Sequence, residues 1–303
     1  MAQRKRDRHG IQPVRVSSIS YIVNGDAGLP YPLEPTIPDG PAGGTWESSY
    51  SGLQRDVLYL DHIGKEDDPY AALAYFDTLL LIDDSESMQE CWGEVEEITM
   101  KIAPICTQYD QDGIDIEFVN HRAAGFYATG RSGYKHIGLM KGNLDMHDSV
   151  AGIYHNVKPK GKCRMDKRLA SILDPYVTEY EKNLNQNGGR ELTTPLNIIV
   201  ISAFQWDGDE DKFGAITRAA RKLDTLRAPK FQVGVQLFRV GKASRETVDT
   251  TVRFLDDKIW KERGVRDMVD MTTWTGSPGV LSPKGLLKVL LGGVRRSIDF
   301  MEV

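Results

Sequence analysis

Long apolar segments are missing from this sequence of 303 residues. The longest candidate runs from Thr78 to Ile82, far short of the roughly 20 residues that a membrane-spanning helix requires. The basic residues near the N-terminus are not followed by the apolar core of a signal peptide. We therefore expect no secretory leader and no membrane partner.

Cysteine is scarce, and its three positions, Cys91, Cys106 and Cys163, cannot all pair in disulfides. Their spacing fits no standard zinc pattern, and the chain has no Asn-x-Ser/Thr acceptor for N-glycosylation. These features favour a reducing compartment. We expect a cytoplasmic protein, with the nucleus as the alternative because the basic cluster Arg4 to Arg8 matches a short import signal.

The sequence also lacks an excess of positive charge, since its formal net charge is -5. A dedicated nucleic-acid binder usually carries a strongly basic face, so we expect no nucleic-acid partner. No phosphate-cradling glycine motif follows any predicted strand, which leaves a nucleotide-dependent enzyme unsupported. At 40% hydrophobic residues, the chain has enough apolar side chains for an ordinary globular core.

Composition divides the chain at about Asp68. Residues 1–67 are rich in Gly and Pro, which disfavours long regular elements, and we interpret them as a largely flexible N-terminal extension. From residue 68 predicted strands begin to alternate with predicted helices, and residues 68–303 form the expected domain.

Within that domain, predicted strands alternate with predicted helices. Leu79 to Ile82 and Leu196 to Ile201 are continuous apolar runs, typical of strands covered on both faces. After the first run, apolar residues recur at helical spacing and predict a helix from Met88 to about Thr107, which Pro104 is expected to kink or end. This alternation predicts an α/β fold: a doubly wound, mostly parallel central sheet with helices on both faces, Rossmann-like in its arrangement. Ligands of such folds bind at the carboxyl ends of the strands.

A chemically distinctive motif stands directly after the first buried strand. Asp83, Ser85 and Ser87 form the pattern D-x-S-x-S, which places one carboxylate and two hydroxyls on one tight loop. Magnesium and manganese prefer such hard oxygen ligands. The alternative is that Ser87 simply caps the helix expected to begin at Met88.

The order and spacing of this and other segments resemble the von Willebrand factor A (vWA) domain family, especially its stand-alone intracellular type known from fungi. The resemblance covers about Asp68 to Phe300. The matching stretches are Phe76 to Met88, Tyr109 to Asp115, Pro195 to Ile201, Val233 to Leu237, Leu255 to Asp257, Arg266 to Asp270 and Gly285 to Gly293. What it implies is a metal-ion-dependent adhesion site, completed by a threonine from a second loop and an aspartate after the fourth strand.

Those last two positions depart from the family. The threonine position is Cys163, whose soft sulfur is a poor magnesium ligand, and the aspartate position is Ala203. Asp207 and Asp209 could compensate, as could Asp84 or Glu86 on the first loop. We therefore expect at most a weak Mg²⁺ or Mn²⁺ site at Asp83, Ser85 and Ser87. Alternatively, the ammonium of Lys160 or Lys162 could occupy the space near Asp83.

These observations predict a protein-interaction module and not an enzyme. The partner would bind at the carboxyl-end face of the sheet, and the resemblance implies that it offers an acidic residue to a bound cation. A metal-assisted hydrolase using the same acidic residues is one alternative, although the sequence shows no evident nucleophile or general base. A structural domain with a vestigial metal site is the other.

Overall fold

The computed structural model describes residues 68–110, 112–123, 133–138, 146–187, 193–207, 213–241, 259–273 and 281–295. The N-terminal extension, residues 1–67, lies outside these described residues. The helical elements are η1 (Ala71–Tyr75), η2 (Glu86–Cys91), α3 (Trp92–Tyr109), α4 (Met146–Asn156), α5 (Met165–Gln186), α6 (Gly214–Thr225), η3 (Lys230–Gln232), α8 (Ile259–Arg263) and α9 (Pro283–Leu291). The strands are β1 (Asp77–Ile82), β2 (Ile114–Phe118), β3 (Tyr134–Ile137), β4 (Leu196–Ser202), β5 (Val233–Arg239) and β6 (Val269–Thr273).

The strands form one sheet of six, in the order β3-β2-β1-β4-β5-β6. Every neighbouring pair is parallel except β2 and β3, which are antiparallel. The chain moves outward from β1 in one direction and from β4 in the other, so the strand order reverses between these two central strands. This α/β topology confirms the predicted fold class and places a topological switch point between β1 and β4.

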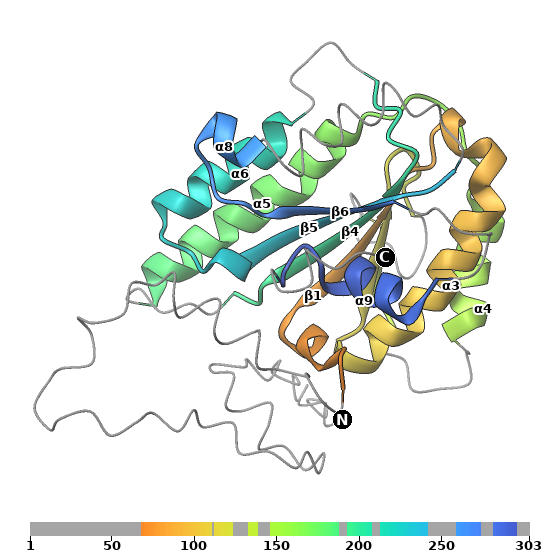
Figure 1. Ribbon diagram of the computed structural model, residues 1–303, viewed down its shortest axis with the longest axis horizontal. Helices are drawn as coiled ribbons and strands as arrows, with labels where there is room; N and C mark the ends of the chain where they lie inside the picture. Colours follow the sequence, from red (N-terminus) through yellow and green to blue (C-terminus); the bar gives the residue numbers. More distant parts are fainter. Residues whose placement is uncertain are drawn as a thin grey trace, which may run out of the picture.

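Both faces of the sheet are covered, which explains why β1 and β4 are apolar throughout. Leu80 and Ile82 of β1 face a core formed with α3, α4 and α9, whereas Leu79 and Leu81 face a core formed with α5 and α6. Figure 1 shows the same division, with α3, α4 and α9 on one side of the sheet and α5, α6 and α8 on the other. No helix in the described part of the chain is long and apolar enough to cross a membrane.

The first predicted helix needed correction at its start, because α3 begins at Trp92 and not at Met88, whereas its predicted end at about Thr107 agrees with the structure. The first helix does not end at Pro104 but continues to Tyr109, and it is preceded by the 3-10 helix η2. A proline costs the helix one backbone N–H, and the packing of α3 on the sheet outweighs this loss. Ser282 caps α9, because its hydroxyl accepts a hydrogen bond from the Gly285 amide at 3.0 Å, and Pro283 stands in the first turn.

Glycines let the end of α9 lie directly on the sheet. A β-carbon at Gly234 of β5 would overlap the carbonyl oxygen of Gly293, and one at Gly292 would overlap the Asp270 and Gln236 side chains. The close approach of two backbones excludes any larger residue at Gly234.

Candidate functional site at the carboxyl ends of the strands

Three loops meet at the carboxyl ends of β1 and β4, and backbone hydrogen bonds join them. The loop after β1 contacts the loop between α4 and α5 twice, through Lys160 N to Asp84 O at 2.8 Å and Glu86 N to Gly161 O at 2.9 Å. The loop after β4 joins the same segment through Asp207 N to Cys163 O at 2.8 Å. The segments that carry the sequence motif and its two altered positions therefore form one continuous surface at the switch point.

Asp83 is at the centre of this junction and is completely buried. Its backbone N–H donates to Ile201 O at 2.9 Å, which extends the pairing of β1 with β4 by one residue. Its carboxylate accepts hydrogen bonds from the Ser85 amide at 3.0 Å, the Ser202 hydroxyl at 2.7 Å and the Cys163 thiol at 3.2 Å. Three donors thus satisfy a buried carboxylate, as its location in the protein interior requires.

The motif serines lie beside this carboxylate. The Ser85 and Ser87 hydroxyl oxygens are 2.9 Å apart; Ser85 is buried and Ser87 is partly exposed. Ser87 does not cap a helix, since it lies inside η2, and α3 begins only at Trp92. The capping interpretation of Ser87 is therefore wrong, and both hydroxyls point into the same small volume.

Cys163 occupies the position next to Asp83 where the family resemblance implies threonine. It is completely buried, and its pKa is raised by desolvation first and then by the charge of Asp83. The sulfur therefore remains a neutral thiol that donates to the carboxylate. A buried thiol of this kind is neither a good nucleophile nor a ligand that Mg²⁺ prefers.

Of the acidic residues expected to compensate, Asp84 and Asp207 hold backbone amides, Glu86 is exposed at the start of η2, and Asp209 lies outside the described residues. Asp84 is buried and accepts the Asn120 and His121 amides at 2.7 and 2.8 Å, and its pKa is raised chiefly by desolvation. Asp207 is exposed and holds the Cys163 amide at 2.9 Å. Asp209 falls in an undescribed segment.

The structure does not place a lysine ammonium beside Asp83, which was the alternative to a metal ion. Lys160 and Lys162 are exposed. The hydrogen-bond partners of Asp83 among the described residues are the amide, hydroxyl and thiol named above. Asp83 itself does not face solvent, because three chain segments close over it.

The donor set at Asp83 fits a divalent cation poorly. It consists of one carboxylate already holding three donors, two hydroxyls and a thiol, with Ala203 at the position where the resemblance implies a second carboxylate. Magnesium and manganese favour several hard, charged oxygens. The arrangement is better suited to hold the three loops together than to hold an ion.

Ser202 is a member of this site that the sequence reasoning missed. Its hydroxyl donates to Asp83 and accepts from the Phe204 amide at 2.9 Å, while Phe204 adopts a left-handed backbone with φ of 58°. The available signal was the hydroxyl residue at the end of a buried strand, immediately before the altered position Ala203. Ser202 thus fixes the start of the loop that follows β4.

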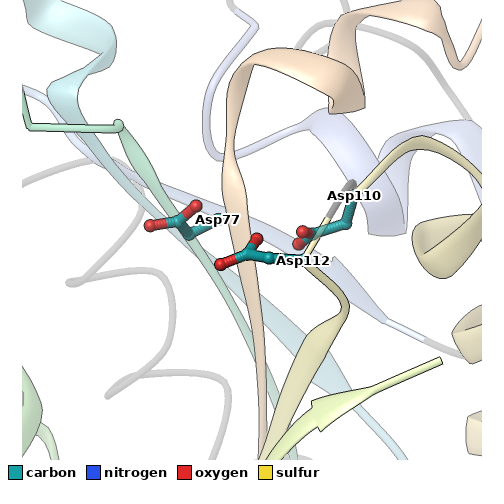
Figure 2. Close-up of side chains that lie close together, drawn as sticks. All are labelled: Asp77, Asp110 and Asp112. Carbon is teal, nitrogen blue, oxygen red and sulfur yellow. The ribbon is translucent and has the colours of Figure 1, made fainter. Parts of the chain in front are cut away.

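A second acidic group lies at the opposite end of the sheet and was also missed. Asp77, Asp110 and Asp112 each place a carboxylate oxygen within 4.8 Å of the others, and together they could hold a metal ion. Figure 2 shows their carboxylates close together at the start of β1 and on the turn before β2. Asp77 begins β1 and Asp83 follows its end, so the two sites are roughly 20 Å apart at about 3.3 Å per residue.

Desolvation and mutual repulsion raise the pKa values of two members of this acidic triad, Asp77 and Asp110. The pKa of Asp77 is raised to about 7, by desolvation first and then by Asp112 and Asp115. The pKa of Asp110 is raised to about 8 by desolvation, against the Thr78 amide that donates to it at 3.0 Å. A bound cation would offset the repulsion that adds to these shifts.

Comparison with known proteins gives limited further information. No known family model matches the sequence, and no curated protein is significantly similar to it. Among solved structures, the chain is similar to the manganese-loaded TRAP protein of Plasmodium vivax, at 13% sequence identity and a TM-score of 0.38. That similarity covers 74% of this chain and 74% of the other.

Proposed function

We propose that this chain is a vWA-type protein-interaction module whose partner binds at the carboxyl ends of β1 and β4. The proposal rests chiefly on the three hydrogen-bonded loops at the switch point, which form a pre-organised surface where ligands of doubly wound sheets bind. The D-x-S-x-S motif at Asp83, Ser85 and Ser87 and its placement after β1 support the family.

A non-enzymatic role agrees with the chemistry of these loops. The one thiol at the junction, Cys163, is buried and donates to a carboxylate, with no imidazole among its described partners. Binding of Mg²⁺ or Mn²⁺ at Asp83 is weak in this proposal, because the second carboxylate and the threonine are replaced.

Site-specific photo-crosslinking tests the proposed face directly. A photoreactive phenylalanine analogue replaces Gln205, which is exposed on the loop after β4, in the full chain expressed in its own cells. The control places the same group at Lys101, an exposed position of α3. We expect a discrete crosslinked protein from position 205 only. Equal crosslinking from both positions, or crosslinking from position 101 alone, would overturn the proposal.

A further inference from the structure

We propose that residues 18–23 of this chain pair as an added strand with the outer edge of β6 and so extend the sheet on that side. This inference goes beyond the proposed function, because β6 is an edge strand and the proposed partner binds at the ends of the central strands β1 and β4. The segment has the sequence Ser18-Ile19-Ser20-Tyr21-Ile22-Val23 and precedes the first described residue, Asp68.

The backbone of β6 has a row of unused hydrogen-bonding groups on its outer side. Val235 of β5 lies in register with Val269, and its N–H donates to Met268 O at 2.8 Å. In a parallel ladder this directs the N–H and C=O of Val269 away from β5, and the alternation repeats at Met271 and Thr273. No hydrogen bond from another described residue reaches these outward groups. An edge of this kind can accept a further strand through its main chain.

The opposite edge of the sheet is less suited to pairing than β6. β3 has four residues, its register with β2 shifts, and its exposed His136 has a left-handed backbone with φ of 55°. Such irregularities interrupt regular pairing with another strand. β6 contains no proline, and its one charged residue, Asp270, is buried under α9, where the Lys288 ammonium lies 3.7 Å from its carboxylate. The edge that remains open to an added strand is therefore that of β6.

The side chains of β6 determine which strand can lie beside it. Val269 and Met271 pack in the core formed with α5 and α6, whereas Asp270 and Thr272 are buried on the opposite face of the sheet, which α9 covers. An added strand continues both faces. It should therefore place apolar side chains beside Val269 and Met271 and small polar side chains beside Asp270 and Thr272.

Residues 18–23 have this alternation. One face carries Ile19, Tyr21 and Val23, and the other carries two serines, with Ile22 as the one apolar residue among them. β-branched and aromatic residues favour strands, and the segment is followed by an Asn-Gly pair that is typical of a turn. A second apolar segment of the extension, Val57 to Leu60, is a continuous run without small polar residues and does not match the two faces of β6.

The connection between this segment and the domain is long enough for the pairing. β6 lies three strand spacings from β1, next to which the described chain begins, and this corresponds to about 14 Å. Residues 24–67 form the connection, and a random coil of that length has a root-mean-square end-to-end distance of roughly 35–40 Å. Such a tether gives an effective concentration in the millimolar range. It therefore favours the chain's own segment over the β6 edge of a second copy, which is the competing occupant.

Amide hydrogen exchange of the full chain, resolved to single residues, tests the inference at the outward amides of Met271 and Thr273. The test variant is Ser20→Pro with Tyr21→Pro, because adjacent residues of a strand point their N–H groups to opposite sides and one of the two prolines must then face β6. The matched control, Leu58→Pro with Tyr59→Pro, makes the same change in the other apolar segment. We expect both amides to exchange at least roughly tenfold faster in the test variant than in the wild type and the control. Exchange in the central strand β4 should be the same in all three proteins.

Three outcomes would overturn the inference. Equal exchange in the wild type and the test variant would show that residues 18–23 do not cover the edge. Faster exchange in the control, alone or together with the test variant, would assign the protection to another part of the extension or to the extension as a whole. Protection in the wild type that is lost on dilution would assign the edge to a second copy of the chain. None of these results bears on crosslinking from position 205, so the proposed function is tested separately.

Discussion

Replacing Asp83 by alanine should destabilise the fold substantially, because the side chain joins three segments of the chain. The substitution leaves the Ser85 amide and the Ser202 hydroxyl without their acceptor, and it also removes the acceptor of the Cys163 thiol. A hydrogen bond to a charged group contributes about 1.5–3 kcal/mol, so two strong bonds contribute about 3–6 kcal/mol. Relief from burying a carboxylate offsets part of this, and we expect a net loss of about 3 kcal/mol.

Urea unfolding followed by circular dichroism measures this loss, and thermal unfolding should show a decrease in Tm of about 6–12 °C for a domain of this size. Asp83→Asn keeps an acceptor for the Ser85 amide and should lose about half as much. Ser87→Ala removes a hydroxyl that is partly exposed and should change stability by less than about 0.5 kcal/mol.

The same experiment separates a structural Asp83 from a metal ligand. A site with a millimolar dissociation constant would stabilise the wild type by about 1.4 kcal/mol when Mg²⁺ is tenfold above that constant. We expect a smaller effect in the wild type. Our reasoning would be refuted if Asp83→Ala cost under about 1 kcal/mol, or if Mg²⁺ stabilised the wild type by that full amount and left the variant unchanged.

Three further predictions concern other charged groups. Arg168→Met should cost about 3 kcal/mol in urea unfolding because it removes the nearer of the two cations, Arg168 and Lys135, that pair with the buried Glu117. Adding Glu117→Leu should recover most of that loss, and a full loss in the double variant would contradict this. The double variant Cys163→Thr with Ala203→Asp adds two hard ligands beside Asp83. It should raise the Mg²⁺ affinity measured by calorimetry and make Tm more dependent on Mg²⁺ than in the wild type. An equal Mg²⁺ response in both proteins would show that Cys163 and Ala203 do not occupy the ligand positions assigned to them. The pKa of Asp77 is raised from 3.8 to about 7 on folding, so its contribution to stability is greatest at low pH and is lost as pH rises through that range. Asp77→Asn should therefore flatten the dependence of stability on pH, measured as urea midpoints between about pH 4 and pH 8. An unchanged pH dependence would argue against the shift.

The sheet was more predictable from sequence than the rest of the fold. The apolar runs of β1 and β4 reflect burial on both faces, which is a local signal. By contrast, the four-residue strand β3 lies among glycines and pairs antiparallel at the edge, and its sequence, Tyr134–Ile137, alternates too briefly to be recognised. The helix α4 (Met146–Asn156) was also missed, since its apolar stripe is short and glycine-rich sequence precedes it.

The candidate site was less predictable from sequence than the sheet. The motif identified Asp83, Ser85 and Ser87, but the burial of Asp83 depends on Cys163 and Ser202, which are 80 and 119 residues away in sequence. A sequence pattern indicates which side chains are present on a loop; it does not indicate which distant donors will close over them. The acidic triad was missed for a related reason, because Asp77 meets Asp110 and Asp112 only when β1 and β2 pair.

The rates at which two buried thiols react with a labelling reagent can report how the protein opens. Cys163 lies under the loops of the proposed binding face, whereas Cys106 is on the buried face of α3, in the core. A thiol reagent can reach Cys163 when those loops separate locally, but it can reach Cys106 only through a larger unfolding event. The ratio of the two labelling rates therefore reports how much less free energy it takes to open this edge than to expose the core. A ligand that clamps the edge should slow the first rate and leave the second nearly unchanged, so occupancy can be followed before the ligand itself is identified.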